Sequence, residues 1–170
     1  MTHGLRSLWL RCAALAWLLA ALPALAQEGS FTVKSMTPET ALSAARAALE
    51  HCRKQGYQVA VAVVDRSGVL QALIRDRFAG AHTVEVATNK AWTSASFRIA
   101  TAALANETQA GKPMSGLRSL PRVLAAGGGL PVEGGGVLLG GIGVSGAPGG
   151  EADEACAQAG IRAVADTLEF

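Results

Sequence analysis

The sequence predicts an α+β domain, with helices packed on an antiparallel sheet of about five strands. Apolar residues at helical spacing occur near both ends of the chain and again in its middle. Between these segments lie short runs of β-branched and small apolar residues that are separated by hairpin turns. The order is helix, two strands, two helices, three strands and helix, which is typical of an α+β domain.

The first helix has clear boundary signals. Thr37, Pro38 and Glu39 supply an N-cap, a first-turn proline and an acidic residue, and we expect the helix to end near Lys54. Its apolar stripe places Cys52 on the buried side. Next we expect strands at 57–64 and 69–75 around a turn at 65–68, followed by helices at 84–97 and 101–111.

The second half begins with a loop at 112–122, which proline and glycine punctuate. Three short strands are then expected at 123–126, 130–133 and 136–144, with Gly134-Gly135 as the hairpin turn between the last two. Asp153 is the expected N-cap of a final helix that ends near Leu168. No repeat or linker divides the chain.

Glycine is crowded into residues 127–146, a segment that still has the pattern of a strand. A strand interior rich in glycine indicates a bulge, a tight turn or the close approach of another backbone or a flat ligand. Residues 141–146 match G-x-G-x-x-G, but Pro148, Gly149 and Gly150 follow where the dinucleotide motif requires a helix. No Lys-Ser or Lys-Thr follows the glycines, so a P-loop is excluded as well.

Residues 1–26 have the pattern of an export signal. Arg6 and Arg11 precede an apolar stretch at 13–22, and 24–26 is a small-residue cleavage site. We expect a mature chain of 144 residues that begins at Gln27, forms a single domain over 27–170, and is periplasmic or secreted without stable membrane insertion. The alternative is an uncleaved anchor.

Cleavage also changes the charge and the cysteine count. Loss of two arginines lowers Lys plus Arg from 15 to 13, which equals the 13 acidic residues, so no basic surface for nucleic acid is indicated. Cys52 and Cys156 remain and either form a disulfide or lie buried as two small apolar side chains. Their number and spacing support neither a zinc site nor covalent haem attachment.

Five motifs occur in a fixed order over nearly all of the mature chain. They are Val61-Ala62-Val63-Val64-Asp65 with Gly68, Lys90-Ala91 with Thr93, the segment 127–131, the segment 140–146, and Cys156-Ala157 with Ala159-Gly160. With these motifs the chain resembles the GlcG/HbpS family of haem-binding proteins, which is related to the C-terminal domain of PduO. The resemblance implies a profilin-like fold, frequent assembly into homo-oligomers, and haem or a related tetrapyrrole as ligand. Some relatives are described as degrading haem.

Haem binding requires an axial ligand, apolar walls and cations for the propionates. His82, in a polar turn before a helix, is the preferred metal ligand over His51, and the alternative is a solvated surface histidine. Met114 and Tyr57 are further candidates that more often pack in a core.

The remaining candidate cofactor-binding residues lie on one expected helix and one expected strand. Lys90 and Thr93 match the family's Lys-Ala-x-Thr motif and offer a charge and a hydroxyl, while Arg98 is a possible partner for a second propionate. Gly141 and Gly143 would let a flat macrocycle or a neighbouring subunit approach the sheet.

One structural alternative for Lys90 and one exclusion complete these assignments. Lys90 alternatively pairs with a carboxylate such as Glu85 or Asp65 and only fixes its helix. No catalytic residues are assigned, because a G-x-S-x-G elbow and a metal-ligand cluster are both missing from the sequence. The expected function is an exported haem-binding or haem-handling protein. The alternatives are an enzyme that degrades haem or acts on a small oxidised metabolite, and a ligand-free assembly module.

Overall fold

The computed structural model describes residues 29–169, so the expected signal segment lies outside the described part of the chain. From Lys34 onward the chain forms one unit. Its elements are α2 (Pro38–Lys54), β1 (Ala60–Asp65), β2 (Leu70–Arg75), α3 (Thr83–Phe97), α4 (Thr101–Glu107), the 3₁₀ turn η1 (Ser115–Ser119), β3 (Gly129–Gly134), β4 (Val137–Ser145) and α5 (Gly150–Leu168). The α+β prediction is confirmed.

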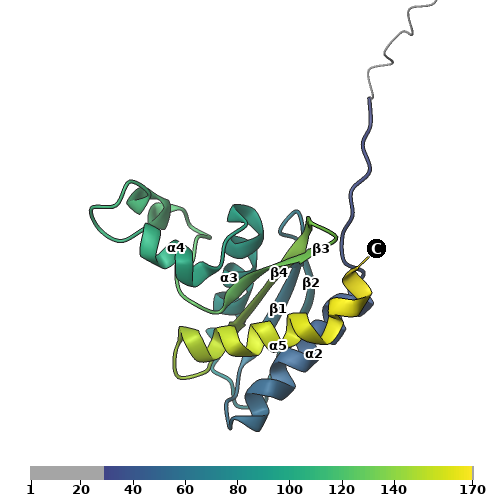
Figure 1. Ribbon diagram of the computed structural model, residues 1–170. Helices are drawn as coiled ribbons and strands as arrows, with labels where there is room; N and C mark the ends of the chain where they lie inside the picture. Colours follow the sequence, from purple (N-terminus) through teal and green to yellow (C-terminus); the bar gives the residue numbers. More distant parts are fainter. Residues whose placement is uncertain (1–28, 170) are drawn as a thin grey trace, which may run out of the picture. The chain divides into compact units, whose positions relative to one another are not determined.

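The sheet is antiparallel throughout and has the strand order β2-β1-β4-β3. Helices α2 and α5 pack on one face, and α3 packs on the other (Figure 1). The alternation of side chains along β1 supplies both layers: Val61 and Val63 join the core with α2 and α5, whereas Ala60, Ala62 and Val64 join the core with α3. The central strands are therefore buried on both faces.

The described sheet has four strands, so the prediction of about five is wrong by one. The predicted strand at 123–126 has no strand geometry. Instead, the backbone N–H of Leu124 donates to the Thr93 hydroxyl at 3.0 Å, which satisfies it without a neighbouring strand. The short apolar run that predicts a strand is here a loop tied to α3.

The other boundaries shift by a few residues. Thr37 caps α2 as predicted, because its hydroxyl accepts the Thr40 N–H at 3.2 Å. Helix α5 begins at Gly150, three residues before the predicted cap at Asp153. The β3–β4 turn is Gly135-Gly136, where φ values of 54° and 76° suit a primed hairpin turn.

A disulfide joins Cys52 of α2 to Cys156 of α5, with a Cα–Cα distance of 5.6 Å. Both residues are buried in the core between the helices and the sheet. Of the two alternatives that the sequence left open, the disulfide is the one observed.

None of the described helices is long and apolar enough to cross a bilayer.

Candidate functional site

Gly141 and Gly143 of β4 face α3, and their missing side chains allow the backbone of that helix to approach the sheet. A Cβ atom on Gly143 would lie 2.1 Å from the Ala87 carbonyl oxygen, and one on Gly141 would lie 2.5 Å from the Ala91 carbonyl oxygen. A side chain at either position would therefore displace α3. The close approach that was expected of a flat ligand or another subunit is made by the chain's own helix, which leaves no space for a macrocycle at these two glycines.

A buried ion pair joins α3 to α5 at the end of β4. Lys90 Nζ donates to Asp153 Oδ2 at 2.7 Å and to the Val144 carbonyl oxygen at 2.9 Å. Each charged side chain is 5% exposed. The second carboxylate oxygen of Asp153 accepts the Ala147 N–H at 3.0 Å. Gly128, at φ 109°, provides the space, because a Cβ there would lie 2.6 Å from the Asp153 Cβ.

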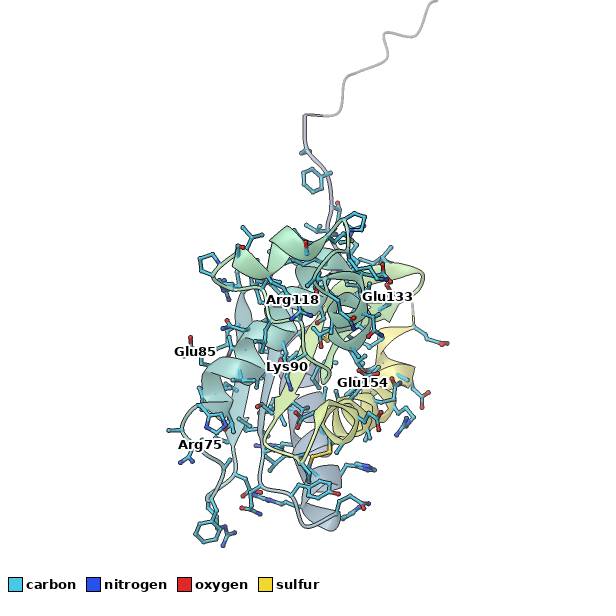
Figure 2. All side chains as sticks on the ribbon, turned by 90° about the vertical axis from the view of Figure 1, so that its left-hand side faces the viewer. Arg75, Glu85, Lys90, Arg118, Glu133 and Glu154 are labelled. Atoms are coloured by element: carbon cyan, nitrogen blue, oxygen red, sulfur yellow. A yellow bond between two sulfur atoms is a disulfide. The ribbon has the colours of Figure 1, made fainter. Side chains whose placement is uncertain are left out.

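The two charges of this pair compensate each other within the protein. Burial raises the pKa of Asp153 above its ordinary value of 3.8, and the hydrogen bond and charge of Lys90 oppose that rise. Figure 2 shows Lys90 inside the molecule and Glu85 at its outer edge. Lys90 is thus paired with a carboxylate, as the structural alternative proposed, but the predicted partners Glu85 and Asp65 are wrong. Its charge is already neutralised by Asp153.

Thr93 also makes its contacts within the protein. Its side chain is fully buried, and its hydroxyl donates to the Arg122 carbonyl oxygen at 3.3 Å while accepting the Leu124 N–H. These bonds attach the loop after η1 to α3. The hydroxyl proton of Thr93 is therefore already used within the protein, and none is left to donate to haem as predicted.

Arg98 and His82 lie at opposite ends of α3. Arg98 ends α3 in a left-handed conformation with φ 54° and has an exposed side chain. Sixteen helical steps of 1.5 Å place the two residues about 24 Å apart along the helix axis. The structure therefore does not bring the predicted cofactor-binding residues together at one place.

His82 lies at the other end of α3, on the wall of a pocket of about 470 Å³. It occupies the N-cap position, but its side chain makes no capping hydrogen bond. Among the described residues, no hydrogen bond or ion pair to its imidazole is present, and the residue is exposed. An imidazole in this state has both ring nitrogens available for a ligand.

The pocket is formed by three segments that are distant in the sequence: the turn after α2, the loop between β2 and α3, and the end of β4 with the start of α5. Its lining residues include Tyr57, Phe78 and Asp153, together with the loop from Ser145 to Pro148. Phe78 is 79% exposed, which is unusual for a phenylalanine and leaves an aromatic face open at the pocket. Tyr57, the alternative axial ligand, therefore lines the same pocket as His82, whereas Met114 is not among its lining residues.

One buried polar atom in this pocket has no partner. The Oε1 atom of Gln58, another lining residue, is inaccessible to solvent and accepts no hydrogen bond. A buried acceptor without a donor is unfavourable by about 1–3 kcal/mol.

Several residues of the pocket could not be identified from the sequence. Asp153 was interpreted as a helix cap, and Phe78 and Gln58 carried no motif. The only sequence signal for them was their place in or beside polar turns that border apolar runs, which is too common to indicate a site. No group of three or more metal-ligating side chains occurs in the described range 29–169.

Comparisons with known proteins place these features in a family. Residues 36–162 match the family described as haem degrading protein HbpS-like. The chain belongs to this family. The match confirms the family resemblance that the five sequence motifs indicate.

Solved structures of family members have the same fold. HbpS is 38% identical with a TM-score of 0.75, and the match covers 82% of this chain and 96% of HbpS. A double mutant of HbpS from Streptomyces reticuli has the same identity and TM-score, with 84% and 96% covered. A complex of PduOC with haem is 32% identical with a TM-score of 0.72, and the match covers 76% of this chain and 94% of that one.

The curated relatives are longer proteins. Corrinoid adenosyltransferase PduO from Salmonella typhimurium is 35% identical over 121 residues, which is 70% of this chain but 36% of PduO. The chain therefore spans about a third of the length of this relative. The comparisons establish the family, and the adenosyltransferase activity of the longer protein is not carried over.

Proposed function

We propose that this protein is an exported haem-binding protein that holds the tetrapyrrole in the pocket lined by His82, which we call the His82 pocket. The observation that carries the proposal is the free imidazole of His82 at a pocket of about 470 Å³, beside the exposed ring of Phe78. The volume lies within the usual range of ligand pockets. The haem complex of the related PduOC supports the choice of ligand.

The residues of the pocket fit haem in most respects. Imidazole is a common axial ligand of haem iron, and Tyr57 and Phe78 offer aromatic surface for the macrocycle. Lysine and arginine do not occur among the lining residues, so the propionates would extend into solvent.

Bound haem would supply redox-active iron, and the chain would supply binding and orientation. In this proposal His82 would hold the metal, and Phe78 would offer apolar surface to the macrocycle. The Lys90–Asp153 pair has a supporting role. It fixes α3 against α5, and through Ala147 it fixes one wall of the pocket.

A haemin titration followed by the Soret band tests the proposal. We expect the parent protein to shift and sharpen the Soret band, and the His82→Ala variant to bind at least about tenfold more weakly because the axial bond is lost. His51→Ala is the matched control, since His51 belongs to α2 and is not among the lining residues. Equal binding by the His82→Ala variant and the parent would exclude His82 as the ligand.

The proposed location is periplasmic or extracellular. The export pattern of residues 1–26 and the disulfide between Cys52 and Cys156 support it, because disulfides persist in oxidising compartments. Cell fractionation combined with N-terminal sequencing would test this. We expect a mature protein that begins at Gln27, and an uncleaved cytosolic protein would contradict the proposal.

A second candidate function is haem degradation, which the description of the matching family favours. Haem-loaded protein would be mixed with hydrogen peroxide, and loss of the Soret band would be compared with that of free haemin. Faster loss with a defined tetrapyrrole product, identified by mass spectrometry, would support turnover. Protection of haem from bleaching would support binding alone.

Homo-oligomer formation is also proposed. Edge strand β2 carries Leu70 and Leu73 as exposed apolar residues, and the turn before it exposes Val69. Such a strand edge favours association. Sedimentation with and without haemin would test this and would separate the alternative of a ligand-free assembly module, which predicts a stable oligomer that binds no haem.

A further inference from the structure

The imidazole of His82 lies directly against Gly80, two residues earlier in the loop before α3. A Cβ atom on Gly80 would lie 2.7 Å from His82 Cε1 and 2.9 Å from Nδ1. Side chains essentially never approach this closely, so any residue other than glycine would displace the ring. The backbone of Gly80 does not have a positive φ, so the turn itself does not require glycine at this position.

The backbone that carries Gly80 is held firmly by the start of α3. Its carbonyl oxygen accepts the Thr83 N–H at 3.0 Å and the Thr83 hydroxyl at 2.6 Å. Thr83 is 1% exposed, so it cannot move without disturbing the core. The Arg75 guanidinium also donates to the neighbouring Ala79 carbonyl oxygen.

A second anchor ties the beginning of the same loop to α2. Arg53 Nε and Nη2 donate to the two carboxylate oxygens of Asp76 at 2.7 Å and 2.9 Å. Asp76 is 1% exposed, and its backbone N–H donates to the Val59 carbonyl oxygen at 2.9 Å. The loop is therefore fixed at both ends, and the exposed His82 side chain is the part that yields if Gly80 gains a methyl group.

We infer that Gly80 is a positioning residue that keeps the His82 imidazole in its orientation at the pocket. This inference rests on the proposed haem site and adds a residue that acts through His82 without touching the ligand. Residues that orient a metal-binding histidine commonly change metal affinity by about 10- to 100-fold when they are altered. We expect a loss of that size in the Gly80→Ala variant.

The test combines haemin titration with NMR of the ligand-free protein. Gly80→Ala should weaken haemin binding by about 10- to 100-fold and should shift the ring carbon-bound proton signals of His82 before any ligand is added. The matched control is Gly116→Ala, because nothing lies within 4 Å of a Cβ at Gly116 and its φ is not positive. This control should behave like the parent in both measurements, and thermal unfolding should show that all variants are folded.

The outcomes separate the two proposals. If His82→Ala binds weakly while Gly80→Ala binds like the parent with unchanged ring signals, the positioning role is wrong and the haem site stands. If His82→Ala binds like the parent, the haem site fails, and the inference built on it fails too. Should Gly80→Ala not fold, Thr83→Val, which removes the hydroxyl bond to the Gly80 carbonyl, should weaken binding in the same direction, and parent-like binding would overturn the inference.

Discussion

The Lys90–Asp153 pair and the His82 pocket meet at the end of β4, where Asp153 belongs to both, but the hydrogen bonding of Lys90 and of His82 differs. The pair is buried, and Lys90 donates two hydrogen bonds to protein oxygens. His82 is exposed, with an imidazole that the described protein groups leave free. A motif that contains lysine and threonine looks like a ligand site in a sequence, whereas the satisfied hydrogen bonds in the structure show that it stabilises the fold. We therefore expect the ligand site where a polar side chain has no protein partner, as at His82.

The largest expected effect comes from breaking the buried pair. Lys90→Met leaves the Asp153 carboxylate buried without its cation, and removal of one partner of a buried ion pair costs about 3–5 kcal/mol. Urea unfolding would measure the loss. The double variant Lys90→Met with Asp153→Leu should recover much of it, since no charge is then left unpaired. Stability unchanged in the single variant would contradict the structural role of the pair.

The disulfide supports both regions, because α2 leads to Tyr57 of the pocket and α5 carries Asp153 of the pair. Its cysteines are separated by 104 residues, and closing a loop of that length stabilises a fold by about 2–5 kcal/mol. The Cys52→Ala and Cys156→Ala double variant should lose a free energy of unfolding in this range. A denaturation curve identical to that of the parent in its oxidised form would contradict this expectation.

A substitution at Gly143 of strand β4 is expected to have an effect of intermediate size. Gly143→Ala places a methyl group against the Ala87 carbonyl oxygen, and overpacking of this kind costs about 1–3 kcal/mol. Thermal unfolding would measure it, with Gly116→Ala as the control that has open space. If Gly143→Ala instead left stability intact and abolished haem binding, the glycines would belong to a ligand site, and the comparison drawn above would be wrong.

The smallest expected effect is a pH dependence of the free energy of unfolding. It arises from the Arg53–Asp76 ion pair, which anchors the loop between β2 and α3 that leads to His82. The hydrogen bond from Arg53 holds the pKa of Asp76 below its ordinary value of 3.8. Between the lowered folded pKa and 3.8, Asp76 is therefore more often protonated in the unfolded chain than in the folded protein. The ion pair stabilises the fold fully above about pH 4, and this stabilisation is lost as the pH falls through the folded pKa. Because Arg53 is 45% exposed, we expect about 1 kcal/mol or less. Unfolding curves of parent and Asp76→Asn should converge below pH 3.8, and parallel curves across that range would contradict the assignment.

Much of the fold could be predicted from the sequence, because its determinants are local. The cap at Thr37, the hairpin turns and the glycine after α2 are signals within a few residues of the element that they end or begin. The predicted strand at 123–126 failed because its partner is the hydroxyl of Thr93, and no local pattern encodes such a tertiary contact.

The candidate site could be predicted only in part. His82 and Tyr57 were identified by the chemistry of their side chains, and the structure places both on one pocket. The partner of Lys90 is Asp153, 63 residues away, which periodicity cannot reveal. The glycines correctly indicated a close backbone approach, but the sequence could not show that the approaching backbone is that of α3.

The most direct test of this account is to map where a tetrapyrrole contacts the protein. Amide NMR spectra recorded during titration with diamagnetic gallium protoporphyrin would report on both regions at once. The account predicts that the largest perturbations fall on the lining of the His82 pocket, at residues 56–58, 78–83 and 145–148, while Gly128, Gly141 and Gly143 change little. Perturbations centred on those three glycines and on Lys90, with the His82 loop unchanged, would contradict it.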